Sequence, residues 1–318
     1  MDILLTGSVA YDYLMTFPGH FKEQILPERL ESISLSFLVD GMTKQRGGIA
    51  PNIAYTMALL GQKPRVMATV GEDFGDYRAW LEDKGVDTTL MKVVPGIFTA
   101  SFFATTDHAS AQIASFYPGA MGYSATQSLK ELDKKPDLVI VSPSSPDAMM
   151  KFPAEARELG IPYLYDPSQQ VLRLEGQELA RDMEGAYFLF CNDYEFGLIS
   201  KKTGWSLDQI LEHVKVLVIT RGKDGADLYS DGDSVHIPTV PEDEVVDPTG
   251  VGDAFRGGFL AGYSHGFDWK LCGEIGSLSA VYCLEQRGTQ NHSYTRQDFV
   301  QRFRKHFNDS GKLDVLLK

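Results

Sequence analysis

Short runs of apolar residues alternate with amphipathic stretches along most of this chain of 318 residues. The runs lack strict alternation of polar and apolar positions, which is typical of strands buried on both faces of a parallel sheet. They lie at residues 3–6, 65–70, 137–141, 162–165, 186–191 and 214–220. Helical spacing occurs between them, for example at residues 51–60, 77–84 and 147–159. The pattern predicts an α/β fold whose mainly parallel central sheet is covered by helices on both faces.

Two segments depart from this rhythm. In the first, residues 32–37 alternate between polar and apolar positions, which predicts a half-exposed strand. In the second, residues 99–117 are rich in Thr, Ser, Ala and Phe and also favour β-structure. We therefore expect a small β lid of residues 13–46 and 98–118 beside an α/β body of residues 1–12, 47–97 and 119–318. A hairpin within residues 226–237 is expected to be an ordinary surface feature.

The composition narrows the class of protein. A hydrophobic fraction of 43% and a charged fraction of 23% are typical of a soluble globular protein. The net charge of −13 argues against a nucleic-acid partner, because phosphate backbones are held by clustered Lys and Arg. We find no apolar run of membrane-spanning length and no secretory signal, and the three cysteines have no disulfide or zinc spacing. A cytoplasmic protein without a membrane partner is the expectation.

The stretch that carries candidate chemistry runs from Asp247 to Phe259, with a helix expected to begin near Gly252. The first turn of a helix exposes unpaired N–H groups that bind anions. Gly250 and Gly252 let the backbone approach such a ligand closely. Asp253 would then lie beside the anion, where its carboxylate can take the proton of an attacking hydroxyl. The alternative is a capped helix in which Asp253 only complements the helix dipole.

Familiar phosphate-binding motifs are missing from the sequence. Gly222-Lys223 is followed by Asp224 and Gly311-Lys312 by Leu313, so neither pair completes a Walker A motif. The first predicted strand is not followed by a dinucleotide-binding glycine pattern. A phosphate site in this chain must therefore be of another kind.

Four segments together resemble the ribokinase, or phosphofructokinase-B, family of carbohydrate kinases. They are, in the family's order, residues 47–54 (GGIAPNIA), residues 192–195 (NDYE), residues 220–225 (TRGKDG) and residues 247–255 (DPTGVGDAF). Within that family the chain is most similar to bacterial adenosine kinases of the mycobacterial type, on segments such as residues 34–40, 111–120 and 166–170. The resemblance implies a ribokinase-like α/β fold with a β lid and a homodimer formed through it. It also implies transfer of the ATP γ-phosphate to the 5′-hydroxyl of adenosine, in purine salvage.

Site residues follow from the resemblance position by position. Asp12 would hold the ribose hydroxyls beside Gly48 and Asn52, and Phe102 and Phe116 would stack on the adenine. Around the nucleoside the resemblance implies Ser8, Ser36, Gln169 and Gln170. At the transferred phosphate it implies Asp253 with Gly250, Val251, Gly252 and Arg173. At ATP it implies Asn192, Thr220, Gly222, Gly225 and Gly288, with Glu195 and Asn192 organising Mg²⁺ through water; a K⁺ site near Asp247 also belongs to the family pattern.

Two features depart from the family pattern, and two other functions stay open. Val251 is bulkier than the small residue usual between the two glycines, and the strand register leaves Phe103 as an alternative to Phe102. The first rival is a kinase of the same family acting on a sugar or another nucleoside. The second is a nucleoside-binding protein without activity, which an intact Asp253 and an intact glycine turn argue against.

Overall fold

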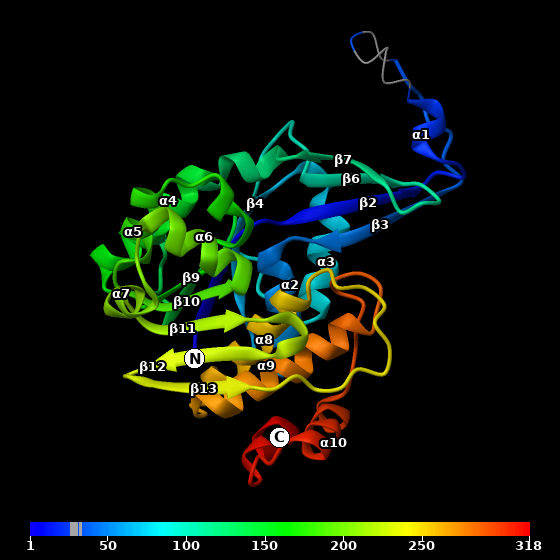
Figure 1. The fold of residues 1–318 in the computed structure, drawn as a ribbon. Coiled ribbons are helices and arrows are strands. Elements are labelled where there is room, and N and C mark those ends of the chain that lie inside the picture. Colours follow the sequence, from blue (N-terminus) through cyan, green and yellow to red (C-terminus); the bar gives the residue numbers. More distant parts are fainter. Residues whose placement is uncertain (26–30, 32–33) are drawn as a thin grey trace.

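The computed structural model describes residues 1–25, 31 and 34–318. Its largest element is a nine-stranded sheet with the order β13-β12-β11-β10-β9-β8-β1-β4-β5 (Figure 1). Neighbouring strands from β11 to β5 are parallel, and only β12 and β13 run antiparallel. The strand bounds are β1 Ile3–Thr6, β4 Arg65–Val70, β5 Met91–Val93, β8 Leu138–Val141, β9 Tyr163–Tyr165, β10 Ala186–Asn192, β11 Val214–Thr220, β12 Ala226–Ser230 and β13 Asp233–Ile237. The predicted parallel sheet is confirmed.

Helices cover both faces of this sheet, so the body is the predicted three-layer α/β/α sandwich (Figure 1). One face is covered by α2 Ile49–Leu59, α3 Gly75–Asp83, α8 Val251–Ser264 and α9 Trp269–Leu284. The other is covered by α4 Pro146–Leu159, α5 Gly176–Met183, α6 Asp193–Thr203 and α7 Leu207–His213. A last helix, α10 Arg296–His306, packs on the outside of α8 and α9 through a third apolar cluster.

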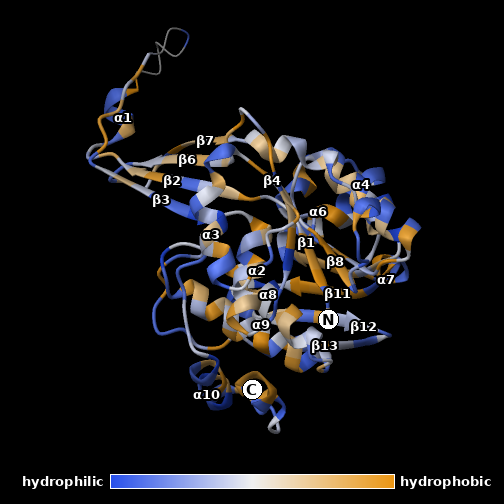
Figure 2. Ribbon diagram, turned by 180° about the vertical axis from the view of Figure 1, so that it is seen from behind, coloured by the Kyte–Doolittle hydropathy of each residue, from blue (hydrophilic) through white to orange (hydrophobic). Residues whose placement is uncertain are grey.

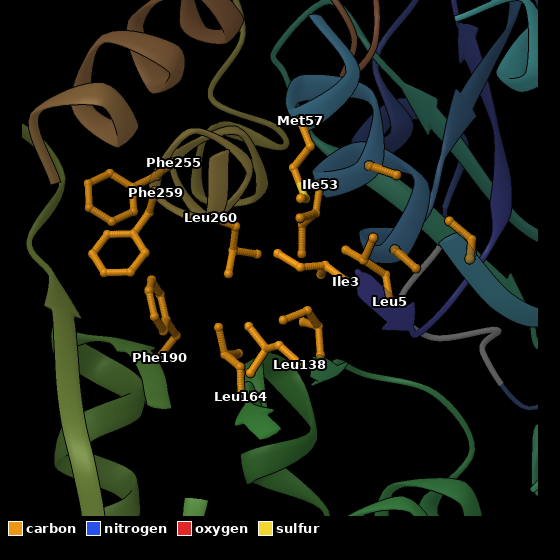
Figure 3. Close-up of a cluster of buried hydrophobic side chains, with 14 of the residues drawn as sticks. Ile3, Leu5, Ile53, Met57, Leu138, Leu164, Phe190, Phe255, Phe259 and Leu260 are labelled. Carbon is orange, nitrogen blue, oxygen red and sulfur yellow. The ribbon is translucent and has the colours of Figure 1, made fainter. Parts of the chain in front are cut away.

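The core explains why the apolar runs form these strands. Figure 3 shows Ile3 of β1 between Ile53 of α2 and Leu260 of α8, with Leu5 further along the strand beneath α2. Leu4, the residue between them, points to the opposite face and joins the cluster under α4 and α5. A strand buried on both faces has no polar face, so its sequence does not alternate between polar and apolar residues. The central strands accordingly appear hydrophobic in Figure 2.

The lid is a separate four-stranded sheet with the order β3-β2-β6-β7, which extends away from the body (Figure 1). Its strands are β2 Ala10–Thr16, β3 Gly41–Gly47, β6 Ala100–Thr106 and β7 Gln112–Tyr117, with the short helix α1 Phe21–Gln24 beyond its far end. The parallel pairing of β2 with β6 joins segments far apart in the sequence, as in the pair Ala10 and Ala100. The prediction that two distant segments share a small sheet is thus confirmed.

The strand predicted at residues 32–37 is wrong for the part that can be described. Ser32 and Ile33 lie outside the described residues, and Ser34 to Phe37 belong to no strand. Phe37 instead packs edge-on against Phe17 and Phe21, with ring centroids 5.2 and 5.0 Å apart, beyond the end of β2. The apolar positions of this segment serve a small aromatic cluster, so their alternation does not reflect strand pairing.

The hairpin expected on the surface is also placed differently. β12 pairs with β11, so the hairpin extends the central sheet at its edge. Leu228 and Ile237 are buried against α9 and the core for this reason. Among the described residues, no helix is both long and apolar enough to cross a bilayer.

Candidate active site

The helix α8 begins at the turn that the sequence singles out. Gly250 is its N-cap residue and adopts the left-handed conformation, with φ of 77°. A Cβ atom at Gly250 would lie 2.7 Å from Cγ2 of Thr289, so both conformation and space favour glycine here. The N–H groups of Val251, Gly252 and Asp253 start the helix and have no carbonyl of the same helix to bond. This turn therefore has the donors and the dipole of an anion site.

Asp253 lies in this first turn and is partly exposed to solvent. Nδ2 of Asn52 donates a hydrogen bond of 2.8 Å to its Oδ2 atom. Burial raises the pKa of Asp253, while the charge of Arg256 and the bond from Asn52 act in the opposite direction. A carboxylate with a raised pKa beside unpaired N–H groups has the properties of a general base next to an anion.

Asn52 is itself held by a buried chain of hydrogen bonds. Its Oδ1 atom accepts from Oγ1 of Thr289 at 2.8 Å and from Nε2 of Gln290 at 2.6 Å. Gln290 also donates to the hydroxyl of Tyr77, which donates to the carbonyl of Gly47 at the end of β3. The side chain of Asn52 is thereby fixed with its amide group toward Asp253. Thr289, Gln290 and Tyr77 were not predicted, because they carry no motif of their own.

A buried ion pair lies behind the same turn. Nε and Nη2 of Arg256 contact the two carboxylate oxygens of Asp166 at 2.7 and 2.9 Å. Nη1 of Arg256 donates to the carbonyl of Gly252 at 2.9 Å. Burial raises the pKa of Asp166 to about 6 in spite of this guanidinium. One feature of the sequence could have indicated this ion pair: Arg256 is the only Lys or Arg within helix α8, which is mostly apolar.

Asp12 lies in a row of side chains on one face of the lid. It pairs with Gln45 of β3 and Phe102 of β6, and Phe102 pairs with Phe116 of β7. Gln45 approaches the loop between α9 and α10, because its Oε1 would lie 2.5 Å from a Cβ at Gly288. This face therefore looks toward the turn at Gly250, whereas Phe103 stacks on Tyr13 on the other face, 4.9 Å between centroids.

The carboxyl group of Asp12 faces a second carboxylate. Burial, followed by the charge of Asp247, raises the pKa of Asp12 to about 6. Asp247 is fixed by the N–H groups of Gly288 and Thr249, each at 2.9 Å. Asp247 is therefore near enough to Asp12 to act on its charge, in a setting where a ligand hydroxyl or a cation would relieve their repulsion.

The other predicted nucleoside contacts are Ser8, Gly48, Gln169, Gln170 and Ser36, of which Ser36 lies apart from the rest. Gly48 has φ of 98°, and a Cβ atom there would lie 2.5 Å from the carbonyl oxygen of Ser8. Gln170 is buried and donates to the carbonyl of Ser144 at 2.7 Å, while Gln169 is exposed. Ser36 does not join them: it is exposed and precedes Phe37, which packs beyond the far end of the lid.

Four of the five predicted ATP residues lie at the carboxyl edge of β10 and β11, whereas Gly288 lies in the loop after α9. Asn192 and Thr220 are direct partners at the ends of these strands. Asn192 caps α6 in a reciprocal arrangement with Glu195, with both bonds at 2.8 Å. Gly222 and Gly225 have φ of 56° and 85° and form the turn after β11. Glu195 keeps one carboxylate oxygen outside the cap, and the charge of Glu195 raises the pKa of Asp253, so the two carboxylates are near one another.

The structure connects two predictions less closely to Asp253: the role of Arg173 and the magnesium site. Arg173 is exposed after a short 3₁₀ turn at Ser168–Leu172, and within the described residues no hydrogen bond or ion pair of its side chain joins it to Asp253. Across residues 1–25, 31 and 34–318 there is also no group of three or more His, Cys, Asp or Glu arranged to hold a metal ion. Glu195 with Asn192 fits only a magnesium ion that keeps most of its water, as Mg²⁺ commonly does.

Known proteins are similar to this chain over nearly its whole length. The profile of the "pfkB family carbohydrate kinase" matches residues 6–296. A nucleoside kinase of Methanothermobacter thermautotrophicus is 32% identical over 306 residues, which cover 95% of each chain. The nucleoside kinase of Burkholderia thailandensis in complex with ADP-inosine has a TM-score of 0.83, 40% identity and 96% coverage of both chains. That of Methanocaldococcus jannaschii, an archaeal member of the ribokinase family, has a TM-score of 0.86 at 27% identity, over 96% of this chain and 99% of its own. The predicted ribokinase-like fold is confirmed.

Proposed function

Because this chain belongs to the pfkB family of carbohydrate kinases, we propose that it transfers the γ-phosphate of ATP to the 5′-hydroxyl of a purine nucleoside, adenosine foremost. The observation that carries the proposal is the place of Asp253, in the first turn of α8 and held by Asn52 at 2.8 Å. A base at that point touches the acceptor hydroxyl while the N–H groups of the same turn face the phosphate. One short segment thus serves both reactants.

The reaction follows from this geometry. The 5′-hydroxyl gives its proton to the free carboxylate of Asp253 as its oxygen bonds to the γ-phosphorus. The bond from that phosphorus to the β-γ bridging oxygen breaks, and ADP leaves with the bond's electrons. The N–H groups of Val251, Gly252 and Asp253 offset the charge on the phosphoryl oxygens. We assign to Arg173, whose side chain is exposed, a contact with the same phosphate.

A purine nucleoside suits the row on the inner face of the lid. Asp12 and Gln45 offer acceptors to the ribose hydroxyls, and the neighbouring Phe102 and Phe116 offer a flat apolar surface to the base. A sugar without a base would leave that apolar surface without a contact. The complex of the Burkholderia thailandensis kinase with ADP-inosine supports the same class of ligand. Ser8, Gly48, Gln169 and Gln170 complete the proposed pocket, whereas Ser36 is too far along the lid to be included.

ATP is assigned to the edge formed by Asn192, Thr220, Gly222 and Gly225, together with Gly288 in the loop after α9. Magnesium neutralises phosphate charge when bound, and here Glu195 and Asn192 would hold it through water. A potassium ion near Asp247 would occupy the neighbourhood of a carboxylate already fixed by two N–H groups.

A homodimer through the lid is proposed on a separate observation. The outer face of the lid carries Tyr13 stacked on Phe103, with Met42 and Ile113 exposed nearby. An exposed apolar group on a thin sheet is typical of an interaction surface. A second copy of the chain, placed sheet against sheet, would cover it. Sedimentation velocity of Met42→Lys against the unchanged protein tests this, and a monomer in both would refute it.

An ADP-release assay with adenosine, inosine, guanosine, cytidine, ribose and fructose 6-phosphate tests the proposed function. We expect turnover with purine nucleosides, and a loss of about two to four orders of magnitude in Asp253→Asn, the usual worth of a general base. Turnover of a sugar without any nucleoside turnover would overturn the substrate. Binding of adenosine without ADP release would favour a nucleoside-binding protein over a kinase.

A further inference from the structure

The guanidinium group of Arg256 lies near several carboxylates, next to the turn at Gly250 that starts α8. Arg256 and Asp166 are both buried, at 6% and 0% exposure. Burying an ion pair is costly, and apolar residues of similar size are often at least as stable in its place. Packing alone therefore gives no reason for a charge at this position of α8. The pair's location, one helical turn after Asp253, points to a role in the site.

We propose that Arg256 is a positioning residue for the general base: its guanidinium, clamped by Asp166 and bonded to the carbonyl of Gly252, keeps Asp253 ionised and fixes the first turn of α8. This inference rests on the proposed function, since it gives a role to a residue that touches neither nucleoside nor ATP. Arg256 acts through Asp253 and Gly252. It is distinct from Arg173, which is exposed and assigned to the phosphate itself.

The contacts of Arg256 with Asp166 and Gly252 leave the carboxylate of Asp253 free to react. Nη1 and Nη2 of Arg256 donate to Gly252 and Asp166 at 2.9 Å each, and Nε lies 2.7 Å from the second carboxylate oxygen of Asp166. Asp253 receives its hydrogen bond from Asn52 instead. Arg256 thus stabilises the negative charge of Asp253 through space without occupying the oxygen that must accept a proton. A direct Arg256–Asp253 salt bridge would have blocked that oxygen.

The charges around Asp253 show why a cation is needed there. Burial raises the pKa of Asp253, and the charge of Glu195 of α6 adds to this rise. Asp166, which follows β9, is close enough for Asp253 to raise its pKa in turn. Cys283 of α9 stays a neutral thiol, because burial and then Asp253 raise its pKa to about 12. Asn52 of α2 is uncharged, so Arg256 is the cation that offsets these carboxylates.

The sign of the effect follows directly. Removing the guanidinium removes an influence that lowers the pKa of Asp253, so a larger fraction of Asp253 would be protonated at neutral pH. A neighbouring opposite charge typically shifts a carboxyl pKa by about one to three units. The acidic limb of the pH–rate profile should therefore move to higher pH by at least one unit in Arg256→Met. Turnover lost on the acidic side of the profile should return as the pH rises.

Three further variants separate this role from a structural one. Arg256→Lys keeps a cation and should return the acidic limb toward its original position. Asp166→Asn with Arg256→Met removes both buried charges together, which protects the fold if Arg256→Met alone does not purify as a folded protein. Arg302→Met is the matched control, because Arg302 makes a similar two-bond pair with Glu285 just after α9 and is not among the charged groups that shift the pKa of Asp253. We expect it to lower thermal stability without moving the pH profile.

Two readouts keep the outcomes apart. The pH dependence of kcat with adenosine or inosine reports the base in turnover. The carbon NMR titration of Asp253, assigned by its loss in Asp253→Asn, reports the same group without any turnover. An upward shift in both readouts for Arg256→Met, with rescue by Arg256→Lys, supports the proposal. An unchanged titration of Asp253 in a folded Arg256→Met protein overturns it. Absence of nucleoside phosphorylation by the unchanged chain overturns the proposed function, while the NMR titration still decides the role of Arg256.

Discussion

The Asn52→Asp substitution exchanges the amide that donates to Asp253 for a carboxylate of nearly the same shape. The oxygen that accepts from Thr289 and Gln290 is kept, so the buried chain to Tyr77 and Gly47 can persist. The donor at 2.8 Å from Asp253 is replaced by a second acidic oxygen. The change therefore acts on the charge of the site and leaves its packing nearly intact.

The magnitude follows from the distance. Two unit charges 2.8 Å apart repel by about 6 kcal/mol at an effective dielectric constant of about 20. Each pKa unit corresponds to about 1.4 kcal/mol, so the pair would take up one proton across the neutral range. A shared proton restores the hydrogen bond but occupies the base. We expect turnover at pH 7 to fall about 100-fold or more and to rise again with pH, while the unfolding free energy changes by less than about 2 kcal/mol.

The assay is ADP release between pH 5.5 and 9.5, with thermal unfolding measured on the same samples. Asn52→Ala is the control, because it removes the donor without adding charge and leaves Thr289 and Gln290 with their other acceptors, Arg46 and Tyr77. It should lower turnover less than Asn52→Asp does at pH 7. A wild-type pH profile in a folded Asn52→Asp protein would refute the reasoning that Asn52 and Asp253 act as a unit.

Three further predictions concern other parts of the site. Since the pKa of Asp12 is raised to about 6, the KM for the nucleoside should rise as pH falls through that value; Asp12→Asn should show a high KM with no such step. Gly250→Ala should lower stability by about 1 to 3 kcal/mol and weaken ATP use, because the new methyl would meet Thr289 at 2.7 Å in a left-handed turn; unaltered kinetics would count against the turn as the anion site. Phe102→Ala should raise the KM for adenosine at least tenfold, whereas Phe103→Ala, on the other face, should change KM little; the reverse result would reassign the base contact.

Local chemistry makes part of the site predictable from the amino-acid sequence. Gly250, Gly252 and Asp253 lie within four residues, so the helix start, its N–H groups and the carboxylate come together without help from the rest of the chain. The cap of α6 is predictable for the same reason, because Asn192 and Glu195 bond across three residues. The sequence also predicts the rows of buried strands, since burial on two faces requires continuous apolar runs.

Long-range contacts cannot be predicted in this way. The bond from Asn52 to Asp253 spans 201 residues, and the pair of Asp166 with Arg256 spans 90. In neither pair does the sequence around one residue indicate which distant residue it will contact. Residues 34–37 show the opposite failure: their alternation predicts a strand, but an aromatic contact with Phe17 and Phe21 decides their conformation.

The sequence by itself therefore determined the layered α/β body, the helix start at Gly250 and the identity of the carboxylate within it, because each depends on neighbours a few residues away. Only the tertiary structure decided the register that places Phe102 beside Asp12, the buried chain that orients Asn52 and the ion pair behind Gly252. Those features form when distant segments pack, and packing depends on shape and burial that no single segment contains.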